Sequence, residues 1–376
     1  MVCRIQFVGG VSTLLLVAAC GGGGSSGSST PAAAPVMPEV TVAASAPVKS
    51  IVLLPDAPAP AIATAAAPTT APVSVAPPST YPAGGSNKVA FDLLNAERVR
   101  CGFGAVQQNA ALDAASADSS VYFAFRAAEG YFSASTYFHV QDPAKSGFTG
   151  VQPIDRAVAR GYGGDFATDF AQDVIRAAKP VDVRSDAQLS AAQISDLLST
   201  VYHLAGLLAP ITETGIDFRR VMSSDGWDMS RTSILGGNIR GVGVPASTSV
   251  RSYPCEGVTQ VNSGFRPARE TPNPAPDLND GTVGTPIYIE APAGQALRLT
   301  GASVRSLDGD APIALRTISA ETDVYAASPI RRVAANQAFL LPLVRLKRGV
   351  RHQVQASGTQ GGAAFSIDFS FTPSLE

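Results

Sequence analysis

Two of the chain's three histidines lie in local patterns that could support chemistry. His139 ends the run Tyr137-Phe138-His139 and precedes a stretch rich in glycine and proline, and His203 directly follows Tyr202. A neutral imidazole binds divalent transition metals, and its pKa of about 6.5 lets it exchange a proton near physiological pH. Two such rings, with one or two carboxylates and an open coordination position, would suit zinc. These two histidines are therefore the candidate site residues.

The segments around both histidines follow the order found in one known family. They read LLNAER at 93–98, NAAL at 109–112, RAVARGY at 156–162, YH at 202–203 and ETGI at 213–216. Together they resemble the CAP superfamily of cysteine-rich secretory proteins, antigen five and pathogenesis-related proteins, in the form found on bacterial surface proteins. The resemblance covers about 87–255 and neither end of the chain.

The resemblance implies a site in which two histidines and two acidic residues face one another across a cleft. His139 and His203 match the two histidines. Asp173 stands about where the family usually has a glutamate, and Asp142 is the nearest candidate for the other acid. Tyr202 would line the same cleft. The family's association with lipids and surface ligands implies a small, lipid-like or cell-surface ligand, and the two imidazoles could also hold zinc or another divalent metal.

Other interpretations of these residues stay open. A metal-dependent hydrolase could use the same cleft, and a structural or adhesive role suits a tethered surface protein. The chain has no P-loop and no His-Glu-x-x-His zinc motif, and we predict binding without turnover. In a purely structural reading, His139 is a hydrogen-bonded ring and His203 lies at a helix C-terminus, where the helix dipole favours it. His352 lies in an alternating run and is expected at the surface.

Helices and strands must position the candidate residues. Serine, asparagine and aspartate residues at 86–87, 109 and 185–186 can cap three helices. The third helix is long, must end before Pro210, and would carry His203 near its C-terminal end. The run 166–178 suits a strand or a helix end, while 216–221 and 233–235 predict strands on either side of a turn at 223–226. This is an α+β fold, and the resemblance specifies the CAP-type α-β-α sandwich over 86–256.

Beyond residue 256 the composition changes. A proline-rich stretch predicts a linker over 257–280. Residues 281–376 then hold short alternating or apolar runs at 287–289, 296–299, 313–318, 339–344, 352–355 and 365–371, separated by turns. Several short strands at this spacing indicate a small all-β sandwich, immunoglobulin-like in the broad sense.

The N-terminus predicts export and anchoring. Residues 1–19 carry Arg4 and an apolar run of signal-peptide type, and Val-Ala-Ala-Cys at 17–20 resembles a lipobox that would make Cys20 the acylated first residue. A secretory signal that merely contains a cysteine is the alternative. Residues 20–85, rich in Gly/Ser and then Ala/Pro, have too little to bury and predict a disordered stalk. We expect a lipid-anchored protein of the cell envelope, at the outer membrane.

Charge and cysteine content indicate which class of partner to exclude and which disulfide to expect. Charged residues make up 15% of the chain and the net charge is −2, so nucleic acid is not expected as a partner. Cleavage would remove Cys3 and lipidation would occupy Cys20, which leaves Cys101 and Cys255. In an exported compartment this pair predicts a disulfide, with two free buried thiols as the alternative.

Overall fold

The computed structural model describes residues 75, 77–135, 139–240, 247–259, 261–278, 281–309, 311–328 and 332–375. The expected leader, the expected lipidation site Cys20, most of the expected stalk, and Tyr137 and Phe138 lie outside these residues. Within the described ranges the chain is a mixed α+β structure, which confirms that part of the predicted fold class. No helix in these ranges is long and apolar enough to cross a membrane. We call 77–240 the helical half and 247–375 the β half.

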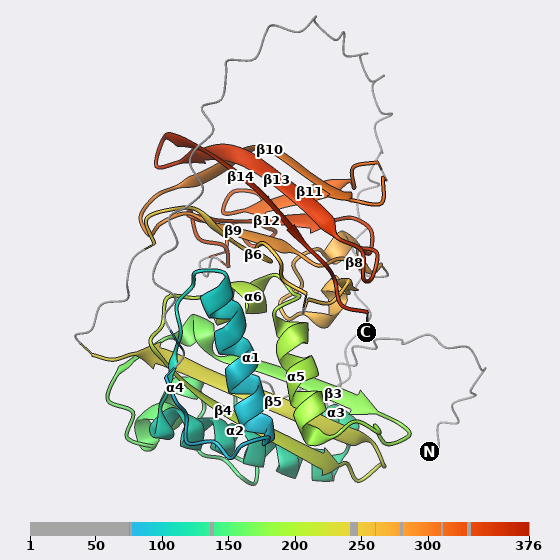
Figure 1. Ribbon diagram of the computed structural model, residues 1–376. Coiled ribbons are helices and arrows are strands. Elements are labelled where there is room, and N and C mark those ends of the chain that lie inside the picture. Colours follow the sequence, from blue (N-terminus) through green and yellow to red (C-terminus); the bar gives the residue numbers. More distant parts are fainter. Residues whose placement is uncertain are drawn as a thin grey trace, which may run out of the picture. The chain divides into compact units, whose positions relative to one another are not determined.

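A mixed sheet lies at the centre of the helical half (Figure 1). Its main pair is the hairpin of β4 (Glu213–Met222) and β5 (Asp228–Asn238), which confirms the predicted strands and turn. β1 (Gln107–Gln108) runs parallel to β4, and β2 (Asp165–Phe166) and β3 (Gln172–Ala178) both pair antiparallel with β5. The run 166–178, which the sequence left undecided, is therefore mostly strand.

Helices cover both faces of this sheet (Figure 1). α1 (Ser86–Arg100) and α5 (Asp186–Leu197) pack against each other, and their core includes Ile216 and Ile234. On the other face α2 (Ala110–Glu129) packs on β4 and β5. A Cβ added at Gly215 would lie 2.1 Å from the α2 backbone, so only glycine permits this approach. Two of the three predicted caps are confirmed, since Asn109 accepts hydrogen bonds from two amides of α2 and Ser185 accepts one from Gln188 of α5. The cap predicted at 86–87 is wrong, because α1 begins at Ser86 and follows Gly85, which makes no side-chain cap.

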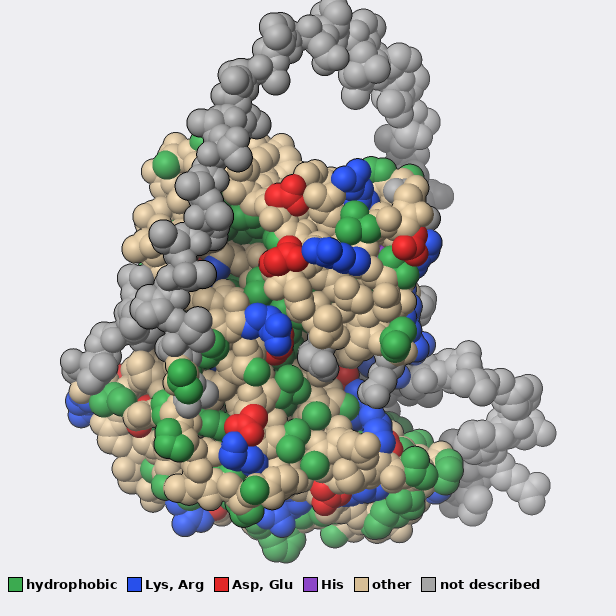
Figure 2. Space-filling view, in the orientation of Figure 1, with side chains coloured by type: hydrophobic (Ala, Val, Ile, Leu, Met, Phe, Trp, Pro, Cys, Tyr) green, Lys and Arg blue, Asp and Glu red, His purple; other side chains and the backbone are tan. Residues whose placement is uncertain are grey.

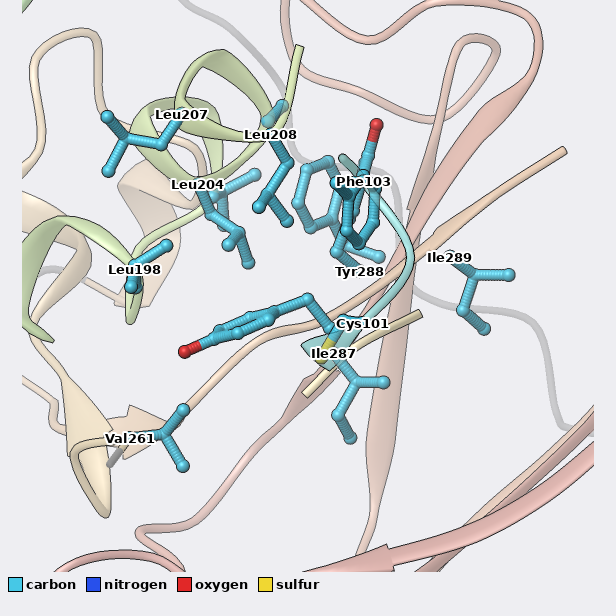
Figure 3. Close-up of a cluster of buried hydrophobic side chains, with 14 of the residues drawn as sticks. Cys101, Phe103, Leu198, Leu204, Leu207, Leu208, Val261, Ile287, Tyr288 and Ile289 are labelled. Carbon is cyan, nitrogen blue, oxygen red and sulfur yellow. The ribbon is translucent and has the colours of Figure 1, made fainter. Parts of the chain in front are cut away.

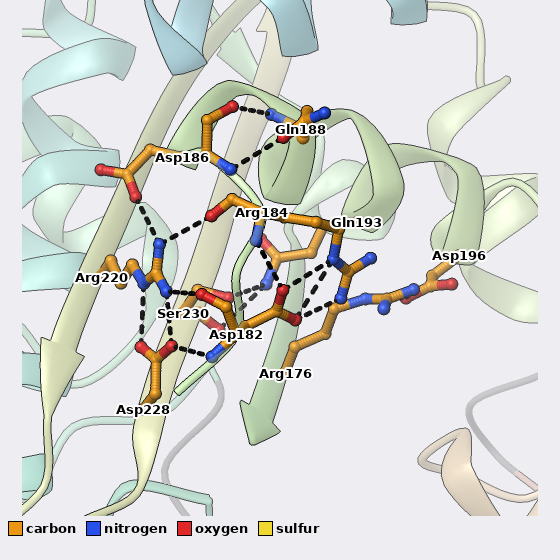
Figure 4. A network of polar contacts seen from close by, with 11 residues as sticks. Arg176, Asp182, Arg184, Asp186, Gln188, Gln193, Asp196, Arg220, Asp228 and Ser230 are labelled. Carbon is orange, nitrogen blue, oxygen red and sulfur yellow. Dashed lines mark hydrogen bonds and ion pairs between the residues drawn. The ribbon is translucent and has the colours of Figure 1, made fainter. Parts of the chain in front are cut away.

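Charged side chains fasten α5 to the sheet (Figure 4). Arg220 on β4 donates to Asp186 at the start of α5 over 3.2 Å and to Asp228 at the start of β5 over 2.6 Å. Hydrogen bonds from Arg220 hold the pKa of Asp228 below its usual range. Further along α5, Gln193 donates to the carbonyl of Ser230 over 2.9 Å. The helix is thus fixed to the sheet at its start and in its middle.

The single long helix expected before Pro210 is wrong, because the chain forms two helices there. α5 ends at Leu197, and α6 (Tyr202–Leu207) begins after a short turn. The hydroxyl of Ser199 donates back to the carbonyl of Ser195 over 2.7 Å, and that of Thr200 donates to Leu197 over 2.9 Å. Such bonds compete with the helical pattern. His203 consequently lies in the first turn of α6 and not at a helix C-terminus.

Every strand run predicted for the β half is confirmed. β10 (Leu297–Ser306), β13 (His352–Gln360) and β14 (Ala363–Phe371) form one antiparallel sheet, and β11 (Leu315–Ser319), β12 (Gln337–Pro342), β9 (Ile287–Glu290) and β6 (Arg251–Tyr253) form another. β10 contacts β12, so the two sheets meet. The small elements are α3 (Tyr131–Ser135), α4 (Pro153–Ala159), η1 (Thr168–Phe170), β7 (Gly264–Phe265), η2 (Pro267–Arg269), η3 (Pro276–Leu278) and β8 (Val283–Gly284).

Residues 257–280, for which the sequence predicted a linker, are packed within the structure. β6, which lies before residue 257, is already an edge strand of the four-stranded sheet. Val258, Val261 and Ala275 are fully buried, and β7 pairs with β8. A proline-rich composition predicts little regular structure, but it does not predict whether the segment packs against its surroundings. Here the segment packs closely, and the described residues after Ala66 form one compact unit.

One hydrophobic core spans the two halves (Figure 3). Phe103 stacks on Tyr288 of β9 at 6.0 Å between ring centroids, and Leu204 and Leu208 of α6 belong to the same cluster. The predicted disulfide is present beside it, with the Cα atoms of Cys101 and Cys255 5.5 Å apart. The disulfide therefore joins the end of α1 to the beginning of the β half.

The surface position predicted for His352 is wrong. Its side chain is fully buried, its Nδ1 lies 2.8 Å from the carbonyl oxygen of Val350, and its ring stacks on Phe371. Val354 and Ala356, two and four residues further along β13, are buried as well. The alternation of this strand was predicted correctly, but its inward face includes the histidine.

Candidate functional site

His139 lies beside the buried carboxylate of Asp173, as the family resemblance implies. Asp173 is the second residue of β3, and its side chain is 3% exposed, against 37% for His139. Nδ1 of His139 is buried and lies 2.9 Å from Oδ2 of Asp173 without a well-aligned hydrogen bond, so the contact is an ion pair when the ring is protonated. The remainder of the ring is open to solvent.

Arg231 fixes the charge of Asp173. Its Nη2 lies 2.7 Å from Oδ1 of Asp173, and the same guanidinium donates to the carbonyl and the hydroxyl of Ser119 on α2. Burial alone would raise the pKa of Asp173, but Arg231, together with His139, outweighs burial and holds that pKa well below its usual range. Asp173 is therefore ionised at neutral pH.

A second buried arginine holds the backbone at His139. Arg156 on α4 donates from Nη2 to the carbonyl oxygen of His139 over 3.0 Å and from Nη1 to that of Gly150 over 3.0 Å. Burial lowers the pKa of Arg156 to about 10, so it stays protonated at neutral pH. Arg156 belongs to the RAVARGY run, one of the segments that resemble the CAP family. In this structure Arg156 positions the segment that carries His139.

His203 has a different carboxylate partner, Glu270, which lies just after η2. Nδ1 of His203 lies 2.9 Å from Oε1 of Glu270. The same carboxylate accepts hydrogen bonds from the backbone amides of Val201, Tyr202 and His203 at 2.7–3.0 Å. Glu270 is thus the N-terminal cap of α6, a favourable place for a negative charge. The side chain of Glu270 is fully buried, and that of His203 is 15% exposed.

α6 is also held at its other end and along its side. Arg98 of α1 donates to the carbonyls of Leu207 and Ala209 over 2.6 and 3.0 Å, where a positive charge complements the helix dipole. Burial lowers the pKa of Arg98 to about 9. The hydroxyl of Tyr202 donates to Asp323 of the β half over 2.5 Å. Polar partners on three sides therefore set the position of this short helix.

The structure brings together some of the predicted site residues and separates others. His139 and Asp173 are in contact, while His203 pairs with Glu270. α6 packs against η1 and against β3, the strand that carries Asp173. Asp142 has a local role, because its Oδ1 accepts a hydrogen bond from the amide of Ala144 over 2.9 Å. The described residues include no group of three or more His, Cys, Asp or Glu side chains that could hold a metal ion. We assign no step to a metal.

Sequence reasoning missed Glu270, Arg231 and Asp323. Glu270 stands in a proline-rich stretch, and Asp323 lies in a loop between β11 and β12. Neither has a local pattern that points to a partner far away in the chain. Arg231 gave a weak signal, because an arginine within a strand of mostly small and apolar residues calls for a buried acid. Comparison with family models, curated proteins and solved structures gives no match to this chain.

Proposed function

We propose that this chain is an exported, lipid-anchored protein of the CAP type that binds a small, lipid-like or cell-surface ligand at His139 and His203. The observation that carries the proposal is that each ring has a buried carboxylate at Nδ1 while part of the ring stays open to solvent. Helices on both faces of a central sheet are compatible with a CAP-type α-β-α sandwich, and the two sheets of the β half with an immunoglobulin-like sandwich.

At His203 the hydrogen bond from Nδ1 to Glu270 leaves the lone pair of a neutral ring on Nε2. An imidazole in this state accepts a hydrogen bond from a ligand or takes up its proton. Binding without turnover is the function we propose. A hydrolase at the same site and an adhesive surface protein are the alternatives that the experiment must separate.

The test is a titration of the folded protein with a fluorescent long-chain alcohol, whose hydroxyl group can donate to a ring nitrogen. The parent should bind it, and His139→Ala and His203→Ala should each weaken binding by about tenfold, the factor expected for about 1.4 kcal/mol from one lost hydrogen bond. The matched control is Asp142→Asn, which keeps the acceptor for the amide of Ala144 and should bind like the parent.

Three results would count against this function. The lipid-like ligand is refuted if the parent does not bind the long-chain alcohol, and the site is refuted if both histidine variants bind it as tightly as the parent. Hydrolysis of a p-nitrophenyl ester that His139→Ala abolishes would favour the hydrolase. Thermal unfolding of each variant separates a lost contact from a lost fold.

A further inference from the structure

Glu270 determines which nitrogen of His203 carries the proton. Its carboxylate already accepts three backbone N–H groups of the first turn of α6, so it is the acceptor in its contact with the ring as well. Nδ1 of His203 must then be the donor, at 2.9 Å. A neutral imidazole has one N–H, so the lone pair is left on Nε2.

The carboxylate that does this lies outside the stretch that resembles the CAP family. That stretch ends near residue 255, whereas Glu270 follows η2, whose turn it closes by donating its amide to the carbonyl of Pro267 over 3.0 Å. The other acidic group at this end of α6 is Asp323, which accepts from the hydroxyl of Tyr202. Both acids come from the β half. The first turn of α6 is thus fixed by groups that a CAP-type domain alone would lack.

We propose that Glu270 is a positioning residue that holds His203 with its proton on Nδ1, so that Nε2 accepts a hydrogen bond from an O–H or N–H group of the ligand. This rests on the proposed function, and it makes the β half a working part of the site. At His139 the carboxylate of Asp173 lies 2.9 Å from Nδ1 without a well-aligned hydrogen bond, so the tautomer is proposed for His203 alone. The ligand class that fits is one that presents hydrogen-bond donors, such as hydroxyl groups.

The tautomer is read directly by long-range 1H–15N correlation NMR on histidine-labelled, full folded protein near pH 8. The chain has only three histidines, so six ring nitrogens must be assigned, and the His139→Ala and His203→Ala variants identify two of the rings. We expect the proton of neutral His203 on Nδ1. In Glu270→Ala, the acceptor for Nδ1 is removed, so the proton should move to Nε2, the nitrogen that carries it in most neutral histidine side chains.

The matched control is Asp323→Asn, which removes a carboxylate at the same end of α6 without touching the ring and should leave the tautomer of His203 unchanged. A proton on Nε2 in the parent would overturn the proposal, and that spectrum alone decides even if Glu270→Ala fails to fold. A folded Glu270→Ala variant with an unchanged tautomer would also overturn it. The measurement needs no ligand, so a proton on Nδ1 of His203 in a protein that binds no long-chain alcohol would refute the proposed ligand and leave the role of Glu270 standing.

Discussion

Replacing Arg231 by methionine should destabilise the protein more than any other change of a single charge in the helical half. Methionine fills much of the volume of the guanidinium stem, but it leaves Asp173 as a buried carboxylate without its ion-pair partner. Breaking a buried pair in this way costs about 3–5 kcal/mol. The carbonyl and the hydroxyl of Ser119 lose their donors as well.

The assay is urea unfolding at pH 7, followed by the fluorescence of Trp227. It is the only tryptophan and packs on Tyr131 at 4.8 Å between ring centroids. The matched control is Arg240→Met, which breaks the solvent-exposed pair with Asp165 and should cost no more than about 1 kcal/mol. In the Arg231→Met background, Asp173→Asn should recover about 1–3 kcal/mol, because it removes the unpaired charge.

The pH dependence of the free energy of unfolding gives a second test of the Arg231–Asp173 pair. The pKa of Asp173 is depressed in the folded state, so its pairing contributes stability above the unfolded value of about 3.9 and loses it as the pH falls through the folded value. The gap in the free energy of unfolding between the parent and Arg231→Met should therefore shrink as the pH falls below about 4. The reasoning is refuted if Arg231→Met lowers the free energy of unfolding by less than about 1 kcal/mol at pH 7. It is also refuted if the double variant, Arg231→Met with Asp173→Asn, is no more stable than Arg231→Met.

Three further outcomes are expected. Cys101→Ala with Cys255→Ala should lower the free energy of unfolding by about 5 kcal/mol, since the bond closes a loop with a sequence separation of 154; equal urea midpoints with and without reductant would contradict this. Burial raises the pKa of Asp217, so Asp217→Asn should stabilise the protein at pH 7, with the gain vanishing toward pH 4; lower stability at pH 7 would count against it. Cys20→Ala should abolish labelling by a palmitate analogue, and unchanged labelling would exclude the lipobox.

Local signals in the sequence predicted local structure well. Asn109 caps its helix as expected, the β4–β5 hairpin lies where the alternation and the turn placed it, and the six strand runs of the β half are strands. The disulfide was predicted because export and lipidation leave only Cys101 and Cys255 as a pair. These predictions need only periodicity, capping preferences and a count of cysteines.

Long-range contacts could not be predicted in the same way. The break between α5 and α6 depends on Ser199 and Thr200 turning back to nearby carbonyls and on Glu270 capping the second helix. Glu270 is more than 60 residues from the amides it binds, and no pattern near it indicates that partner. His352 shows a second limit of prediction from sequence. Alternation separates the two faces of a strand, but it does not show which face is buried.

The burial of β9 affects how the protein can be produced and how its gene could be divided. All four of its residues are buried, with Tyr288 against Phe103 of the helical half, while the strand pairs with β12 and β6 within its own sheet. A chain that ended at residue 256 would leave Phe103, Leu204 and Leu208 facing water, a sticky apolar patch of the kind that drives aggregation. Both halves are therefore needed to complete this core. A gene fusion that transferred only one half would not yield a working module.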